Sequence, residues 1–251
     1  MALNSEQLAA VDCISSGHNL LLLGAAGTGK TFLIKHICKT LKSQNKVVAV
    51  TATTGIACCL YDSAQTIHRW SGIGDGRFHC KEIRQVIKNN VKFADVRKKI
   101  KNTDVLIIDE CSMLSKNFFE CLNEVCKLKD ENQHFGGIQL LLSGDFRQLP
   151  PVPNPLYGEQ GEFCFESNLF SKVLPHRITL TTVLRQSDTE LIHAIHEVSI
   201  GNVSAETALF IESLQRPLEK DDNCIKLFSR NEQVDDYNRQ CIVDFPGELY
   251  E

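Results

Sequence analysis

The chain alternates between short apolar runs and longer stretches in which apolar residues recur at helical spacing. Uninterrupted runs of Leu, Ile and Val of this length are typical of strands buried on both faces, as in a parallel sheet that helices cover on each side. The runs that we predict to be strands are NLLLLG (19–24), KVVAVTA (46–52), DVLIIDE (104–110), IQLLLSGD (138–145), RITLTT (177–182) and CIKLFS (224–229).

Helical patterns lie between these runs, at 30–43, 116–129 and 188–214. Strands that alternate with helices predict an α/β fold built from βαβ units around a parallel sheet. Sheets of this kind bind their ligands at the carboxyl ends of the strands. Polar clusters follow several of the predicted strands, so we expect the functional site at this edge of the sheet.

The organisation of the chain predicts one whole domain and the start of another. Residues 153–164 are rich in Pro and Gly and indicate a surface loop, whereas residues 215–223 are polar and typical of an interdomain linker. We therefore assign residues 1–214 to the first domain. Residues 224–251 supply one predicted strand and one helix, too little for a domain of this kind, and we interpret them as the truncated start of a second domain.

Charge and composition narrow the function only slightly. A net charge of -4 and a pI near 6.1 give no global sign of nucleic-acid binding, although a local basic groove can still contact phosphates. Residues 81–101 carry a marked excess of Lys and Arg. This segment could guide DNA, but we favour a solvated helical face, because only Phe93 offers a ring for stacking.

The cysteines indicate a reducing environment. The chain has 11 of them, an odd number, without a C-x-x-C pair, and we interpret them as reduced thiols that are mostly buried as small apolar residues. No apolar run approaches the ~18 residues of a membrane span, and the N-terminus lacks a signal or transit pattern. We expect an intracellular protein without a membrane span.

The first predicted strand leads into a phosphate-binding loop. The stretch GAAGTGKT at 24–31 fits the pattern G-x-x-x-x-G-K-[ST] and lies between a buried strand and an amphipathic helix, the context that the motif requires. Lys30 would reach the β- and γ-phosphates of ATP, and the Thr31 hydroxyl would ligate Mg²⁺. Backbone N–H groups and the helix N-terminus would hold the phosphates. The residues predicted to bind the nucleotide are Gly24, Ala25, Ala26, Gly27, Thr28, Gly29, Lys30 and Thr31.

Two adjacent carboxylates close the strand DVLIIDE. At the end of a buried strand they are costly unless a cation or a catalytic step uses them. We assign Asp109 to the Mg²⁺ shell and Glu110 to the attacking water as general base. Because transfer to a small substrate would not need Glu110, the pair favours hydrolysis of a nucleoside triphosphate.

A third strand ends in SGDFRQLPPV at 143–152. Gln148 could hydrogen-bond the γ-phosphate or the attacking water and so distinguish ATP from ADP. The prolines behind it stiffen the segment, and a rigid segment next to a phosphate sensor can pass a small displacement to another surface. We predict that this turn couples the nucleotide site to a second site.

With these strand ends, the sequence resembles the Pif (petite integration frequency) and RecD-like branch of superfamily-one DNA helicases, most closely the Pif members. The resemblance covers nearly the whole chain and implies a RecA-like P-loop NTPase domain. The motifs that carry it, besides the phosphate-binding loop, are LNSEQ (3–7), VTATTGIACCL (50–60), TIHRWSGIG (66–74), LIIDECSML (106–114), FGGIQLLLSGDFRQLPPV (135–152), FCFES (163–167) and LTTVLRQSD (180–188). Nothing after 229 resembles the motifs of the family's second motor domain.

The resemblance assigns further residues of the nucleotide site. It implies that Gln7 reads the adenine edge, although Asn4 and Gln7 also have the spacing of a helix capping box. It further implies that Arg185 is the arginine that the family directs at the γ-phosphate, whereas without the resemblance Arg185 is an ordinary surface cation.

The resemblance also implies contacts with single-stranded DNA. Hydroxyls and free N–H groups where a strand gives way to a helix can grip phosphates, and imidazole and indole rings suit stacking. Helix capping by the threonines and a core position for Trp70 are the structural alternatives. The residues predicted to bind DNA are Thr51, Thr53, Thr54, Gly55, Thr66, His68 and Pro150.

The activity implied by the resemblance is that of an ATP-dependent 5′-to-3′ DNA helicase, active in DNA repair, recombination and telomere maintenance in the nucleus or mitochondrion. ATP and Mg²⁺ are the expected cofactors, single-stranded and forked DNA the expected partners, and a monomer the expected state. Two alternatives stay open: another P-loop ATPase, such as a DNA loader or packaging motor, and a non-enzymatic nucleotide-dependent DNA-binding module.

Overall fold

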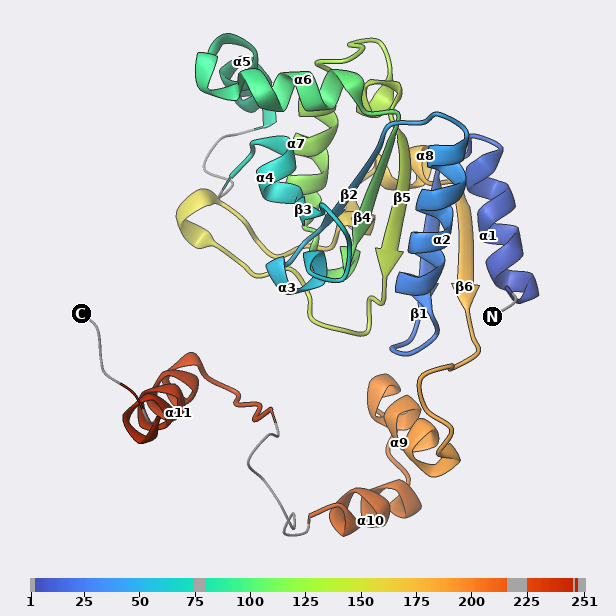
Figure 1. Ribbon diagram of the computed structural model, residues 1–251, viewed down its shortest axis with the longest axis vertical. Coiled ribbons are helices and arrows are strands. Elements are labelled where there is room, and N and C mark those ends of the chain that lie inside the picture. The colour runs from blue at the N-terminus through green and yellow to red at the C-terminus, as the bar shows by residue number, and fades with distance from the viewer. Residues whose placement is uncertain (1–2, 75–79, 216–224, 246, 248–251) are drawn as a thin grey trace. The chain divides into compact units, whose positions relative to one another are not determined.

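The computed structural model describes residues 3–74, 80–215, 225–245 and 247 of the chain (Figure 1). By its internal contacts the chain divides into two compact units, 1–207 and 208–251. The first unit contains the whole sheet and every residue predicted to bind nucleotide or DNA.

The first unit is built on a six-stranded sheet in the order β3-β2-β4-β5-β1-β6, and all of its pairings are parallel. This confirms the predicted α/β class and five of the predicted strands. The two-residue strand β3 escaped prediction because it contains no apolar run. The strands are β1 Leu20–Gly24, β2 Val48–Ala52, β3 Gln65–Thr66, β4 Val105–Asp109, β5 Gln139–Gly144 and β6 His176–Leu180.

Helices connect the strands in the alternating order that the sequence predicts. The α-helices are α1 Ser5–Ser15, α2 Lys30–Ser43, α3 Gly55–Cys58, α4 Ile67–Ser71, α5 Cys80–Asn89, α6 Ala94–Asn102, α7 Lys116–Cys126, α8 Phe170–Val173, α9 Thr189–Ile200, α10 Ala205–Ser213 and α11 Asn231–Asp244. Short 3-10 turns are η1 Val91–Phe93, η2 Cys111–Met113, η3 His134–Gly137, η4 Pro155–Tyr157 and η5 Cys164–Glu166. The helix predicted over 188–214 is interrupted because Gly201 ends α9 in a left-handed conformation.

Helices cover both faces of the sheet (Figure 1), and an apolar layer lies between the sheet and the helices on each face. Successive side chains of a strand point to opposite faces, so Leu106 and Ile108 pack under α4–α8, whereas Val105 and Ile107 pack under α1 and α2. Trp70 is 2% exposed and belongs to the first layer. Trp70 is therefore a core residue, the structural alternative to stacking on DNA.

The basic segment 81–101 forms α5, η1 and α6. Ile83, Ile87 and Ile100 are buried in the core, while the described Lys side chains of the segment lie on its outer surface or are only partly covered. The segment is thus amphipathic, in agreement with the solvated helical face that we favoured.

The second unit differs from its prediction. Residues 225–228 have no regular secondary structure and are not the strand expected at 224–229. A strand requires a hydrogen-bonded neighbour, and none is present among the described residues of this unit. The helix predicted after it is present as α11. Of the predicted linker at 215–223, all but Gln215 lies outside the described residues, and the boundary at 214 stays a prediction.

Cys80 and Cys121 form a disulfide between α5 and α7, which corrects the prediction that all cysteines are reduced thiols. Their separation of 41 residues has no recognisable pattern, so only the packing of the two helices brings them together. Five of the free cysteines, Cys38, Cys58, Cys111, Cys126 and Cys164, are buried as small apolar residues, as expected. No helix in the described part of the chain is long and apolar enough to cross a membrane.

Candidate nucleotide and nucleic-acid site

Three of the predicted motifs meet at one edge of the sheet. β4, β5 and β1 are neighbours in that order, and because they are parallel their carboxyl ends lie side by side. The phosphate-binding loop follows β1, the two carboxylates stand at the end of β4, and the SGDFRQLPPV turn follows β5. The topology therefore assembles the predicted nucleotide site.

The loop after β1 has glycines at positions where a side chain would be strained or would clash. Gly27 and Gly29 have φ of 85° and 89°, which glycine adopts without strain. A Cβ added at Gly24 would lie 2.6 Å from Thr28 Oγ1. Lys30 Nζ donates to the carbonyl oxygens of Gly24 (2.6 Å) and Ala25 (3.2 Å). The ammonium thus lies within the loop, in the place expected for a phosphate contact.

Gln7 forms the capping box that its motif allows and keeps one further donor. It forms a capping box with Asn4, in which Gln7 N donates to Asn4 Oδ1 (2.8 Å) and Asn4 N donates to Gln7 Oε1 (3.1 Å). Its Nε2 is buried without a hydrogen-bond partner among the described residues, close to Gly29. An orphaned buried donor next to a phosphate-binding loop fits a nucleobase acceptor.

The predicted metal ligands Thr31 and Asp109 are linked by a residue that the sequence did not reveal. Asp109 is 2% exposed, and its Oδ1 accepts from Glu110 N at 3.0 Å. Its Oδ2 accepts from the Tyr61 hydroxyl, and the Thr31 side chain lies beside the same hydroxyl. Burial and the nearby Asp109 raise the pKa of Tyr61, so the phenol remains a neutral donor. Tyr61 belongs to no motif, and only the fold shows its position.

The donor set fits Mg²⁺, which prefers oxygen ligands and is commonly held by one or two protein oxygens together with phosphates and water. Ser143 Oγ is a further buried oxygen without a partner in the described part of the structure. Ser143 and Asp109 lie on neighbouring strands, and by strand alternation both side chains face the layer of α1 and α2. The Ser143 hydroxyl is thus an unpartnered polar group on the side of the sheet where the cation is expected.

Glu110 has the environment of a general base. Its φ of 55° is left-handed, uncommon for a residue with a side chain and more frequent at functional sites. The carboxyl is half-buried, and desolvation raises its pKa, as do Asp109 and Asp145, while Lys30 opposes the shift. The Thr53 hydroxyl donates to Glu110 O at 2.8 Å. This bond ties the predicted base to a predicted DNA contact.

Gln148 and Arg185 lie on either side of the loop and the carboxylates. Gln148 shares a pocket of about 250 Å³ with Glu110 and Thr54, and its N–H closes a turn onto Asp145 O at 2.9 Å. Arg185 is exposed, and its backbone N–H donates to Gly27 O at 3.2 Å. Both side chains are therefore beside the predicted phosphate site with their charged or amide ends free to turn toward it.

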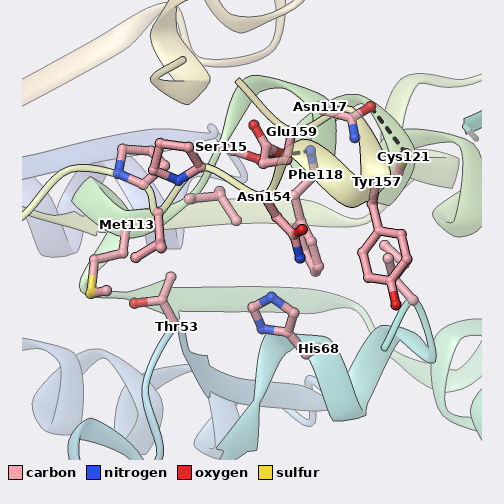
Figure 2. Close-up of a pocket in the computed structure, with 15 residues that line it drawn as sticks. Thr53, His68, Met113, Ser115, Asn117, Phe118, Cys121, Asn154, Tyr157 and Glu159 are labelled. Carbon is pink, nitrogen blue, oxygen red and sulfur yellow. Dashed lines mark hydrogen bonds between the residues drawn. The ribbon is translucent and has the colours of Figure 1, made fainter. Parts of the chain in front are cut away.

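A second pocket, of about 300 Å³, contains two of the predicted DNA contacts (Figure 2). Thr53 and His68 form one wall, and the opposite wall includes Ser115, Asn154 and Glu159. The His68 ring packs against Phe118 with centroids 4.4 Å apart, and burial lowers the pKa of His68. A neutral imidazole held against Phe118 at a pocket wall suits contact with a base or sugar.

The other predicted DNA contacts differ in how accessible their side chains are to DNA. Thr51 is fully buried and donates to Ile107 O at 2.7 Å, which corrects its assignment: β2 continues one residue beyond it. Thr54 and Thr66 cap α3 and α4, each accepting a backbone N–H at 3.3 Å, and Gly55 is exposed. Capping uses only the oxygen as acceptor, so both hydroxyls can still donate to a phosphate.

The two prolines of the turn are not equivalent. Pro150 is exposed, whereas Pro151 is buried and lines the pocket that contains His68. Sequence reasoning chose Pro150, and Pro151 is the proline that the fold adds to this pocket. One turn therefore places Gln148 beside Glu110 and Pro151 beside His68.

Comparisons with known proteins agree with this geometry. A family model described as PIF1-like helicase matches residues 2–206. The chain is 35% identical over 242 residues to the ATP-dependent DNA helicase PIF1 of Emericella nidulans, with 94% of this chain and 32% of that protein covered. It therefore spans about a third of the length of that curated relative.

Solved structures share the fold. The crystal structure of Pif1 helicase from Candida albicans matches with a TM-score of 0.88 at 35% identity, covering 99% of this chain and 56% of that one. The crystal structure of Bacteroides Pif1 bound to ssDNA matches with a TM-score of 0.81 at 25% identity, covering 99% and 57%.

Proposed function

Because this chain belongs to the PIF1-like helicase family, we propose that it is the first motor domain of an ATP-dependent DNA helicase, followed by the start of the second. The helicase moves 5′-to-3′ along single-stranded DNA and opens forked duplexes. The observation that supports this proposal most directly is the convergence of Lys30, Asp109, Glu110 and Gln148 at the carboxyl ends of three adjacent strands.

The proposed hydrolysis assigns one task to each polar residue. Mg²⁺, held by Thr31 and Asp109, would neutralise charge on the β- and γ-phosphates. Lys30 and the loop N–H groups bind the phosphates, and Gln7 Nε2 donates to the adenine edge. Glu110 accepts the proton of the attacking water, and its raised pKa favours that transfer. Arg185 turns toward the γ-phosphate.

Coupling to DNA runs through two short connections. Gln148 and Pro151 belong to the same stiff turn, and Thr53 joins Glu110 to the pocket that contains His68. A displacement at the γ-phosphate therefore has a direct path to the strand, through the turn and through Thr53. Thr53, Thr54, Gly55, Thr66 and His68 contact the DNA in this proposal.

We also propose the cellular setting that goes with this activity. The protein acts as a monomer, in the nucleus or the mitochondrion, in DNA repair, recombination and telomere maintenance. The support for this setting is the family membership.

Nucleotide binding and turnover by the purified chain test the proposal. A fluorescent ADP analogue should bind, and Lys30→Ala should abolish binding. Whatever ATPase rate the chain supports should rise with single-stranded DNA and fall about 10²- to 10⁴-fold in Glu110→Gln, the usual contribution of a general base, while binding persists. A rate indifferent to DNA would instead favour a loader or packaging motor. Nucleotide binding without hydrolysis, even with the second domain supplied, would favour a binding module.

A further inference from the structure

Tyr61 brings a phenol into the nucleotide site from the core. The side chain is 8% exposed, and its ring packs in the apolar layer of α1 and α2. Lys35 of α2 lies above the ring, with Nζ 6.0 Å from the centroid. Because the ring is enclosed, the hydroxyl is the part of Tyr61 that reaches polar groups, and both groups that it meets are predicted metal ligands.

The hydrogen-bond directions at this hydroxyl are fixed by its single hydrogen. The Tyr61 hydrogen goes to Asp109 Oδ2, so toward the neighbouring Thr31 side chain the phenol oxygen can act only as an acceptor. The phenol therefore lies between the Thr31 side chain and the Asp109 carboxylate that it hydrogen-bonds. Asp109 Oδ1 is held separately by Glu110 N at 3.0 Å.

The position of the phenol between Thr31 and Asp109 has a specific consequence for a bound cation. A hydroxyl can ligate a cation only through its oxygen, with its hydrogen directed to an acceptor elsewhere. The Tyr61 oxygen offers that acceptor beside Thr31, which would leave the lone pairs of the Thr31 oxygen free for the cation. The same phenol, together with Glu110 N, fixes the plane of the Asp109 carboxylate, whose terminal torsion has only a broad intrinsic preference.

We propose that Tyr61 is a positioning residue that orients Thr31 and Asp109 for Mg²⁺ with the bound nucleotide. This inference rests on the proposed ATPase site and adds to it a residue outside every motif. Outer partners of metal ligands typically change metal affinity by about 10- to 100-fold when removed. Tyr61→Phe keeps the packed ring and removes only the hydroxyl, so it isolates this role.

The experiment compares ADP binding with and without the metal. A fluorescent ADP analogue is titrated into the unmodified chain, Tyr61→Phe and the control Tyr237→Phe, once in EDTA and once in Mg²⁺. We expect Tyr61→Phe to bind as the unmodified chain does in EDTA and about 10- to 100-fold more weakly in Mg²⁺. Tyr237, which pairs with Phe228 and lies outside both pockets, should have no effect under either condition.

Each other outcome contradicts the proposal in its own way. Unchanged affinity in Mg²⁺ would show that the hydroxyl is not needed, equal losses in both conditions would indicate a packing defect, and tighter binding in Mg²⁺ would show that Tyr61 competes with the cation. Failure of the unmodified chain to bind ADP at all would overturn the proposed function, and the inference with it.

A second measurement leaves the native hydroxyl in place and covers the case in which Tyr61→Phe does not fold. Fluorotyrosine placed at position 61 should show a ¹⁹F shift on addition of ADP with Mg²⁺ that ADP in EDTA does not produce. Identical spectra under the two conditions would contradict the proposal.

Discussion

At the scale of single residues, the backbone matters as much as the side chain. Glu110 departs from the strand in a left-handed conformation, and this turn separates its carboxyl from that of Asp109, which stays buried. Two adjacent acids thus acquire different surroundings: Asp109 is fixed by hydrogen bonds, and Glu110 faces a pocket with Gln148. The sequence predicted different roles for the two acids, and the structure gives them different surroundings.

Other residue assignments required the fold. Thr51 and Thr53 look alike in VTATTG. Thr51, however, lies within β2 and is buried, whereas Thr53 lies just after the strand and lines a pocket. Tyr61 has no motif and no apolar period around it, so its contact with Asp109 depends on a loop path that sequence does not encode locally. The motif residues could be placed from the sequence because they follow apolar runs that identify the strands before them.

The correction at Thr51 leads to a prediction. Thr51→Val keeps the shape of the side chain and removes its hydrogen bond to Ile107 O, so we expect the free energy of unfolding to fall by about 1 kcal/mol. Affinity for a fluorescent single-stranded oligonucleotide should stay unchanged. His68→Ala is the matched comparison and should weaken that affinity. Loss of oligonucleotide binding in folded Thr51→Val would restore Thr51 to the DNA site.

At the scale of elements, periodicity identified strands well and helix ends less well. Buried strands of a parallel sheet are uninterrupted apolar runs, so five of them were predicted within a few residues. The helix predicted over 188–214 became α9 and α10 because Gly201 adopts φ of 71°, and the polar residues after it cap the next helix. A single glycine within a helical pattern does not by itself predict a break.

The α9–α10 junction depends on one carboxylate. Glu197 accepts from Ser204 N at 2.9 Å and from Ser204 Oγ at 2.7 Å, and these bonds lower its pKa to about 2. Since the folded pKa lies below the ordinary value of 4.5, the stabilisation is complete above that value and is lost as the pH falls toward 2.

We therefore expect Glu197→Gln to weaken this junction at neutral pH. Amide hydrogen exchange at residues 202–207 should be faster in the variant than in the unmodified chain. Lowering the pH from 5 toward 2 should shrink the difference in protection between the two proteins. Equal exchange at neutral pH would show that the Ser204 bonds contribute nothing. Glu190→Gln, in the first turn of α9, is the control.

At the scale of the whole molecule, the nucleotide site has one sheet edge and no counterpart from a second sheet among the described residues. The family's motifs predicted this arrangement, since nothing after 229 resembles its second motor domain. The strand expected at 224–229 failed for the same reason: a strand is a property of a sheet, and local sequence alone cannot create the neighbour that it pairs with.

We expect the 251-residue chain to bind nucleotide but not to unwind DNA. Stepping along a strand needs two domains that close around ATP and reopen, whereas the described residues of this chain form a single sheet. A forked duplex with a fluorophore and quencher should give no signal above background with ATP. The matched control is a longer chain that includes a whole second motor domain. Robust unwinding by the 251 residues alone would contradict this expectation.

The two ends of the sheet have a further consequence, for solubility. An open strand edge is a template on which another chain can add a strand and begin to aggregate. Here one edge is β3, only two residues long. The other is β6, where His176, Arg177 and Thr179 are exposed and Thr181 N, just beyond the strand, donates to the Glu6 carboxylate at 3.0 Å. Self-association by strand addition is discouraged at both borders.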